Sequence, residues 1–196
     1  MTNIIGQYVR MVTFLFQRQG IQLTTLFYLR YIQVQGGIKL FQRKLIIFLW
    51  RLAIDRLPTR LNLVSRGVDI GNIGCSICNH GVEDNHHIFF SCLLAKEIWR
   101  KVSLWTSVDI NRFASWSEWL SWYDQWEENI SNKNRMYTIV AATVWVIWRF
   151  QNGVIFSENP MRKDEIFDSI RNYSYTWLFS RSKKQMSWNS WLVKPL

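Results

Sequence analysis

The stretch CSICNHGVEDNHHIFFSC, from Cys75 to Cys92, holds all 3 cysteines of the 196-residue chain. It also holds all 3 histidines, which lie between the second and third cysteines at His80, His86 and His87. The first two cysteines, Cys75 and Cys78, form a C-x2-C pair. Three thiolates and one imidazole make a complete tetrahedral ligand set for zinc. The stretch therefore predicts a zinc loop, around which we expect the rest of the fold to be arranged.

Two other uses of the cysteines have less support. A disulfide framework needs an even number of cysteines, and small disulfide-bonded scaffolds usually carry more of them. One disulfide with a leftover thiol would leave the histidine cluster unexplained. Inert buried thiols are common in proteins, but chance would rarely place all of them within one short stretch. Zinc binding is thus the preferred interpretation.

The spacing allows more than one histidine ligand. His87 gives C-x2-C-x8-H-x4-C, and His86 gives C-x2-C-x7-H-x5-C. His80 follows Cys78 by only two residues and would need a very tight chelate, so it ranks third. The H-x4-C ending matches the back half of the retroviral-type zinc knuckle, although the front half differs, and this favours His87 while His86 stays open. Either choice fills all four positions of one zinc, which predicts a structural metal rather than a catalytic one.

The positive charge of the chain is concentrated before the zinc loop. The net charge is +10. Residues 1–66 contain ten Lys and Arg against one acid, Asp55, whereas residues 67–196 contain fourteen basic and thirteen acidic residues. This asymmetry predicts an acidic partner for the front of the molecule, with nucleic acid preferred over an anionic membrane.

The composition excludes a disordered protein and indicates an intracellular one. Hydrophobic residues make up 48% of the chain, which includes 12 Trp, 12 Phe and 7 Tyr. The longest apolar runs, Leu45–Trp50 and Thr138–Trp148, are shorter than the roughly 18 residues that a membrane-spanning helix needs. With reduced cysteines and no signal peptide, we expect a protein of the nucleus or cytoplasm that does not bind membranes.

A basic helical hairpin is predicted just before the zinc loop. Leu45, Phe48, Leu49 and Leu52 recur at helical spacing, and Pro58 interrupts the pattern. Thr59 is placed to cap a second short helix, Arg60–Arg66, which Gly67 ends. The exposed faces of this hairpin carry four arginines that either are simply solvated or contact phosphates, and these are Arg51, Arg56, Arg60 and Arg66.

Further helices are predicted after the zinc loop. LLAKEIWRKVSLW after Cys92 reads as a helix, and Ser115 to Glu118 is a capping box that opens another. Other helices are expected over Asn134–Phe150, fraying near Gly153, and from Asp164 to Phe179, with Pro160 near the helix start. The aromatic stripe after Ser115 is typical of a core, with a base-stacking platform as the alternative, and it comprises Trp116, Trp119, Trp122, Tyr123 and Trp126.

The predicted architecture is all-α, with an irregular structural zinc loop inserted between helices. We expect three parts. Residues 1–43 are a basic N-terminal segment without a clear helix or strand pattern. Residues 44–106 are the zinc-binding domain, made of the helical hairpin, the Cys3His loop and the following helix. Residues 107–196 are a Trp-rich C-terminal helical region.

No active-site motif is recognisable. The chain has no phosphate-binding G-x-x-x-x-G-K-[ST] loop, no G-x-S-x-G elbow and no H-E-x-x-H. A zinc deaminase would need H-x-E before P-C-x-x-C, which is the reverse of the order here. We therefore expect no enzymatic activity and no small-molecule substrate.

Several motifs carry a resemblance to a known family. In order, the chain contains FLWRLAIDRLPTRLNLVSRGVDI from Phe48, CSIC from Cys75, the acid Glu83, HIFFSC from His87, and Trp99 in AKEIW. Phe48 to Trp105 thereby resembles the reverse transcriptase zinc-binding domain of plant LINE-type (non-LTR) retrotransposons. Further along, VWVIWRFQNGVIF looks like a helix that is usual downstream in this family, with a mild departure at Phe150-Gln151-Asn152.

The resemblance implies zinc ligands and a function. The ligands of the family fall on Cys75, Cys78, His87 and Cys92. In the parent polyproteins this module follows the polymerase. The resemblance therefore implies a detached or degenerate fragment of such an element, which has no polymerase activity and could be non-functional. The function expected is binding of template RNA or target DNA as an accessory to reverse transcription. The alternative is a zinc-stabilised scaffold that docks on a polymerase or another protein.

Overall fold

The computed structural model describes residues 40–179 and 186–196, with side chains from residue 44 onward. The predicted basic segment 1–43 therefore lies almost entirely outside the described residues. The chain falls into two compact units, residues 1–54 and residues 55–196. The expected three-part division of the chain stays a prediction.

In the first unit the described element is α3, Leu40–Ala53. Its buried side chains include the four predicted from helical spacing, Leu45, Phe48, Leu49 and Leu52. Arg51 lies on the exposed side of the same helix. The periodicity of this segment thus correctly separated a buried face from a solvated one.

The second unit begins with the corner that the sequence predicts. Helix α4, Arg60–Val64, is capped by Thr59, whose hydroxyl accepts a hydrogen bond from the backbone N–H of Asn62 at 3.2 Å. The helix is two residues shorter than expected, and the chain turns through Gly67 at a positive φ of 82°. The irregular zinc loop follows, so that α4 lies directly before the metal centre in the chain.

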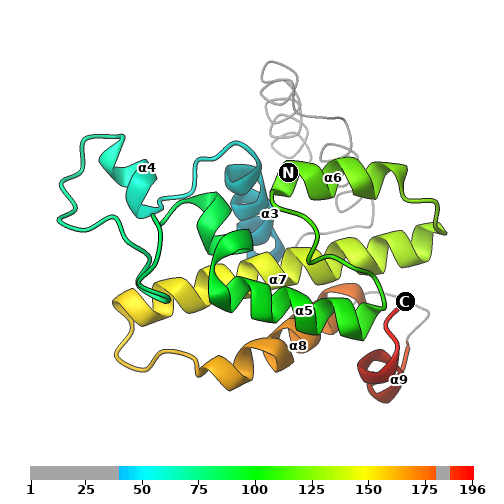
Figure 1. Ribbon diagram of the computed structural model, residues 1–196. Coiled ribbons are helices and arrows are strands. Elements are labelled where there is room, and N and C mark those ends of the chain that lie inside the picture. Colours follow the sequence, from blue (N-terminus) through cyan, green and yellow to red (C-terminus); the bar gives the residue numbers. More distant parts are fainter. Residues whose placement is uncertain (1–39, 180–185) are drawn as a thin grey trace, which may run out of the picture. The chain divides into compact units, whose positions relative to one another are not determined.

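A helical body follows the zinc loop (Figure 1). Its elements are η1 (His87–Ser91), α5 (Leu93–Thr106), α6 (Trp116–Gln125), α7 (Ile130–Phe156), η2 (Lys163–Glu165), α8 (Ile166–Phe179) and α9 (Trp188–Val193). Within the described ranges there is no strand, only a single antiparallel bridge between Gly74 and Val82. The predicted all-α fold with an inserted Cys3His loop is confirmed.

Helix α7 is the centre of this body. It packs against α8 and α5, which lie alongside it (Figure 1). It begins before Asn134 and stays helical to Phe156, so the expected end at Phe150 with fraying near Gly153 was wrong. By length and composition α7 could cross a membrane, but 56% of its most apolar window is buried inside the protein. Core helices pass the same test, and the packing of α7 is that of a core helix.

The tryptophan-rich segment is mostly core, as predicted. Ser115 caps α6 by accepting a hydrogen bond from the N–H of Glu118, and the Glu118 carboxylate accepts one from the N–H of Ala114. Trp119 is fully buried and its ring lies 5.4 Å from that of Tyr137 on α7. The aromatic stripe therefore attaches α6 to α7 rather than presenting all of its rings to solvent.

Candidate metal centre

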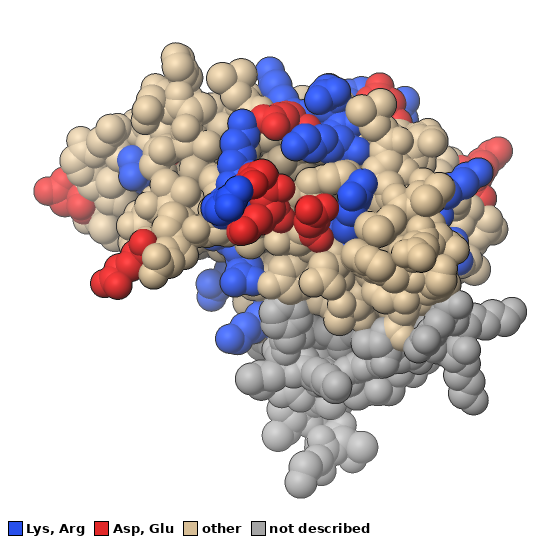
Figure 2. Space-filling model, turned by 90° about the horizontal axis from the view of Figure 1, so that it is seen from below, with Lys and Arg blue, Asp and Glu red and all other residues tan. Residues whose placement is uncertain are grey.

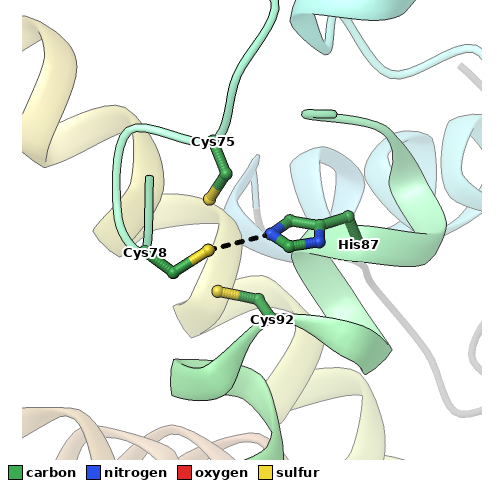
Figure 3. Close-up of side chains that lie close together, drawn as sticks. All are labelled: Cys75, Cys78, His87 and Cys92. Carbon is green, nitrogen blue, oxygen red and sulfur yellow. Dashed lines mark hydrogen bonds between the residues drawn. The ribbon is translucent and has the colours of Figure 1, made fainter. Parts of the chain in front are cut away.

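Four side chains converge on one point between the zinc loop and the helices that follow it. The sulfur atoms of Cys75, Cys78 and Cys92 and a ring nitrogen of His87 all lie within 4.8 Å of one another (Figure 3). Cys75 and Cys78 come from the loop, His87 begins η1, and Cys92 stands directly before α5. The two remaining histidines, His80 and His86, are both exposed.

The donor set fits zinc. In a tetrahedral site with Zn–S bonds of about 2.3 Å, two sulfur ligands stand about 3.8 Å apart, which the separations here accommodate. Cys78 Sγ and His87 Nε2 lie 3.2 Å apart. Three thiolates and one imidazole would fill all four positions and leave no place for a reactive water. The cluster is consistent with one structural zinc, as predicted.

A tight turn brings the two loop cysteines together. The N–H of Asn79 donates to the carbonyl of Cys75 at 3.0 Å, and the N–H of Cys75 donates to the carbonyl of Gly81 at 3.1 Å. Asn79 and Gly81 both have positive φ, 56° and 80°. A Cβ on Gly81 would lie only 2.9 Å from Nδ1 of His87. Glycine at this position therefore leaves room for the histidine ring beside the loop.

A π-helical turn sets the spacing between His87 and Cys92. The N–H of Cys92 donates to the carbonyl of His87 at 2.8 Å, five residues back. The N–H of His87 is held by the Asp84 carboxylate at 2.6 Å. Single π turns are uncommon and occur often at functional sites. This one places the H-x4-C pair on the same side of the chain, where both side chains reach the cluster.

The hydrogen bond at the other ring nitrogen suits His87 to metal binding. Nδ1 lies 3.3 Å from the hydroxyl of Ser91, one turn further along. When Nδ1 carries the proton and donates it to Ser91, Nε2 keeps its lone pair and faces the thiols. Metal-bound histidines usually have such a partner on the second nitrogen. Ser91 is thus placed to fix both the tautomer and the ring orientation.

The cysteines share charge unequally before a metal binds. The hydrogen bond from the Cys92 thiol is the main reason why the pKa of Cys75 is lowered, to about 4. The same contact, followed by burial, raises the pKa of Cys92. One proton is thus held tightly between two adjacent sulfurs. A dication would replace that proton and stabilise both thiolates.

A buried carboxylate connects this loop to its surroundings. Glu83 is only 3% exposed. Gln151 on α7 donates to it at 2.6 Å, and Ser76 between the two loop cysteines lies at 3.5 Å. Arg60 at the start of α4 contributes both a backbone N–H, at 3.3 Å, and an ion pair at 3.5 Å. One side chain therefore joins α4, the zinc loop and the central helix.

The predicted arginines differ in how they are used. Nη1 of Arg60 donates to the carbonyls of Asn72 and Gly74, at 3.3 and 2.8 Å. With its ion pair to Glu83, this guanidinium is engaged in holding the loop. The other three are exposed, and one of them, Arg66, donates to the carbonyl of Arg56. That Arg51, Arg56, Arg60 and Arg66 bind nucleic acid stays a prediction.

Some residues of the site were not singled out from the sequence. The family resemblance includes Glu83 without giving it a role. Gln151 stood out only as part of a mild departure from the family pattern, and nothing in the sequence connected it to Glu83, 68 residues away along the chain. Ser91 and Gly81 could have been noticed. A serine four residues after a ligand histidine reaches the same helix face, and glycine is typical of a tight chelating loop.

The geometry defines a structural zinc-binding module of the Cys3His class. Comparison with known proteins agrees, since residues 38–99 match the family model described as zinc-binding in reverse transcriptase. These residues form a zinc-binding domain of the reverse transcriptase type. The prediction from the sequence motifs is thus confirmed at the level of this domain.

One relative is a protein of Arabidopsis thaliana named "Putative ribonuclease H protein". It is 28% identical over 120 residues, which are 61% of this chain and 19% of that protein. The chain therefore spans less than a fifth of the length of this relative. No solved structure matches. The only family domain detected is the zinc-binding one, and the absence of enzymatic activity stays a prediction.

Proposed function

We propose that this chain is a nucleic-acid-binding accessory module of reverse transcription, derived from a plant LINE-type retrotransposon. The observation that carries the proposal is the match of residues 38–99 to a zinc-binding domain of reverse transcriptase. The zinc would be structural, and its task is to hold the loop in a fixed arrangement next to α4. The proposal places the protein in the nucleus or cytoplasm, where its RNA or DNA ligand would be found.

Charge supports this proposal. Residues 1–66 carry nearly all of the excess positive charge, and Arg56 and Arg66 expose their side chains on the hairpin that precedes the zinc loop. Contacts between such cations and phosphates release counterions and make affinity depend steeply on salt. Since Arg60 is engaged with Glu83, we expect it to act on binding through the shape of the loop rather than as a free cation.

The test is a set of binding isotherms for RNA and DNA at several salt concentrations. Arg56→Gln/Arg66→Gln should reduce the slope of log K against log salt by about 0.7–0.9 for each lost contact. Arg162→Gln is the control, because its side chain is exposed but paired with Asp164. The proposal would be wrong if the wild type bound neither RNA nor DNA, or if its affinity did not change with salt.

A second candidate is a scaffold that docks on the polymerase part of a parent polyprotein. It is favoured by apolar side chains that remain exposed on and after α4, namely Leu61, Val64 and Val68. The purified polymerase segment should then retain the chain after nuclease treatment, and Val64→Ser should weaken this association. If nuclease treatment removed the complex, nucleic-acid binding would be favoured over the scaffold function.

A further inference from the structure

The outer face of α5 carries two cations between two exposed leucines. Leu93, Lys96, Arg100 and Leu104 follow at steps of three, four and four residues, which places them on one side of a helix. The two leucines are among the most exposed large apolar side chains described, at 67% and 71%. Lys96 and Arg100 are exposed between them. The four residues, here called the α5 stripe, form one continuous surface feature.

The cations of the α5 stripe are free, whereas their neighbours are paired. Glu97 on the same helix is bound by Lys163 at 2.7 Å and by Lys101 at 3.5 Å. Within the part of the chain that the structure describes, the side chains of Lys96 and Arg100 form no ion pair. Figure 2 shows basic and acidic side chains lying next to each other near the centre of the face it draws. The stripe is thus positive beside Glu97, whose charge Lys101 and Lys163 balance.

Helix stability does not explain this arrangement. Lys96 lies near the start of α5, whose first turn has no acid, and a cation there opposes the helix dipole. Lys96 and Arg100 are also like charges four residues apart, which repel each other. The exposed leucines contribute little to the core. An anion bound along the stripe would relieve both unfavourable charge terms.

The metal centre and the core hold the stripe in place. Helix α5 begins directly after the ligand Cys92. Its inner face buries Ile98, Trp99 and Val102, and the indole N–H of Trp99 donates to the carbonyl of Phe89 in η1 at 2.6 Å. The stripe is therefore a rigid surface joined to the zinc site rather than part of a loose loop.

We propose that the α5 stripe binds the backbone of a nucleic-acid strand. Lys96 and Arg100, separated by about 6 Å along the helix axis, contact two phosphates, while Leu93 and Leu104 contact sugars and unpaired bases at either end. This inference rests on the proposed function and names a surface for it that the charge of residues 1–66 does not predict. Unpaired bases are favoured because in a duplex the paired bases are stacked inside.

The experiment measures binding of the full chain to a single-stranded RNA and a single-stranded DNA oligonucleotide across salt concentrations. Lys96→Gln/Arg100→Gln should reduce the salt slope by about 0.7 for each of the two contacts. Lys101→Gln/Lys163→Gln is the matched control, because it removes the same charge from neighbouring cations that are already paired with Glu97. This control should leave the slope nearly unchanged.

The leucines are tested separately. Leu104→Ser should weaken binding without changing the salt slope, since no charge is lost. Val193→Ser is its control. It also replaces an exposed apolar side chain with serine, at a position that is 82% exposed on another helix. Far-UV circular dichroism and zinc content show whether each variant keeps its fold.

Three results would count against the α5 stripe. Equal effects of the two double variants would mean that only net charge matters. A reduced slope for Arg56→Gln/Arg66→Gln, together with an unchanged slope for Lys96→Gln/Arg100→Gln, would overturn the stripe and leave the proposed function standing. A wild-type chain that binds neither oligonucleotide would overturn both.

Discussion

Gly81 shows how a residue without a side chain leaves room for a metal-binding side chain. Its φ of +80° favours glycine, and a Cβ would press against the ring of His87 at 2.9 Å. Gly67 has nearly the same φ, +82°, but nothing within 4 Å of its Cβ position. A substitution at Gly67 therefore adds only backbone strain, whereas the same substitution at Gly81 adds backbone strain and crowds His87.

We predict that Gly81→Ala weakens zinc binding by about tenfold or more, the scale seen when the surroundings of a ligand are disturbed. Both Gly81→Ala and Gly67→Ala should cost roughly 1–2 kcal/mol of stability, because alanine is disfavoured at positive φ. Competition with a chromophoric chelator measures the zinc affinity of each. Equal zinc affinities in the two variants would show that the ring tolerates the added methyl group.

At the scale of single residues, the sequence predicted the donors better than their supports. Cysteine and histidine spacing identified the cluster and favoured His87 because donor chemistry is local along the chain. The engagement of Arg60 was not predictable in the same way, since its partners are backbone carbonyls and a carboxylate 23 residues further on. Side chains that act through such folded contacts leave no periodic pattern.

At the scale of elements, the contact between Glu83 and Gln151 joins the zinc loop to α7. Both side chains are buried, and the 2.6 Å hydrogen bond between them spans 68 residues. Phe89 of η1 adds a ring contact with Trp148 on the same helix, at 6.3 Å. The zinc loop therefore packs on a helix that lies beyond the end of the family match at residue 99.

We predict that Gln151→Ala destabilises the zinc-bound protein by about 1–3 kcal/mol, because a buried carboxylate loses a hydrogen-bond donor. Asn152→Ala is the control, since Asn152 donates only within its own helix, to the carbonyl of Trp148. Urea unfolding in the presence of zinc measures both. A double-mutant cycle with Glu83→Gln should show coupling, and strict additivity would mean that the two side chains do not act together.

Local signals also explain which elements could be predicted. The caps at Thr59 and Ser115 were readable because capping is decided by neighbouring residues. The continuation of α7 through Gly153 was not, because tertiary packing against α8 outweighs the weak helix propensity of one glycine. The π turn at His87–Ser91 likewise depends on the folded site, and the sequence offered only the H-x4-C spacing.

At the scale of the whole molecule, zinc is expected to contribute as much free energy as folding itself. Structural zinc sites bind with apparent free energies of about 10–16 kcal/mol, whereas whole domains are stable by about 5–15 kcal/mol. Through Glu83 and Phe89, the metal centre is joined to the central helix of residues 55–196. Metal removal should therefore affect the body and not only the loop.

The dependence of zinc binding on pH tests how the proton is shared between Cys75 and Cys92. At neutral pH the lowered pKa of Cys75, about 4, leaves it a thiolate, whereas the raised pKa of Cys92 keeps that thiol protonated. Zinc must displace the Cys92 proton, so the association constant should rise at least tenfold per pH unit between about pH 6 and 8. Affinity, and the stability linked to it, should fall as the pH falls.

Titration with a competing chelator at each pH gives the slope, and thermal unfolding at saturating zinc gives the linked stability. Native mass spectrometry should find one zinc in the wild type and none in Cys92→Ala. Retained zinc in that variant would show that the ligand set is wrong. An affinity independent of pH would show that no proton is displaced, and would contradict the charge arrangement that the paired sulfurs of Cys75 and Cys92 imply.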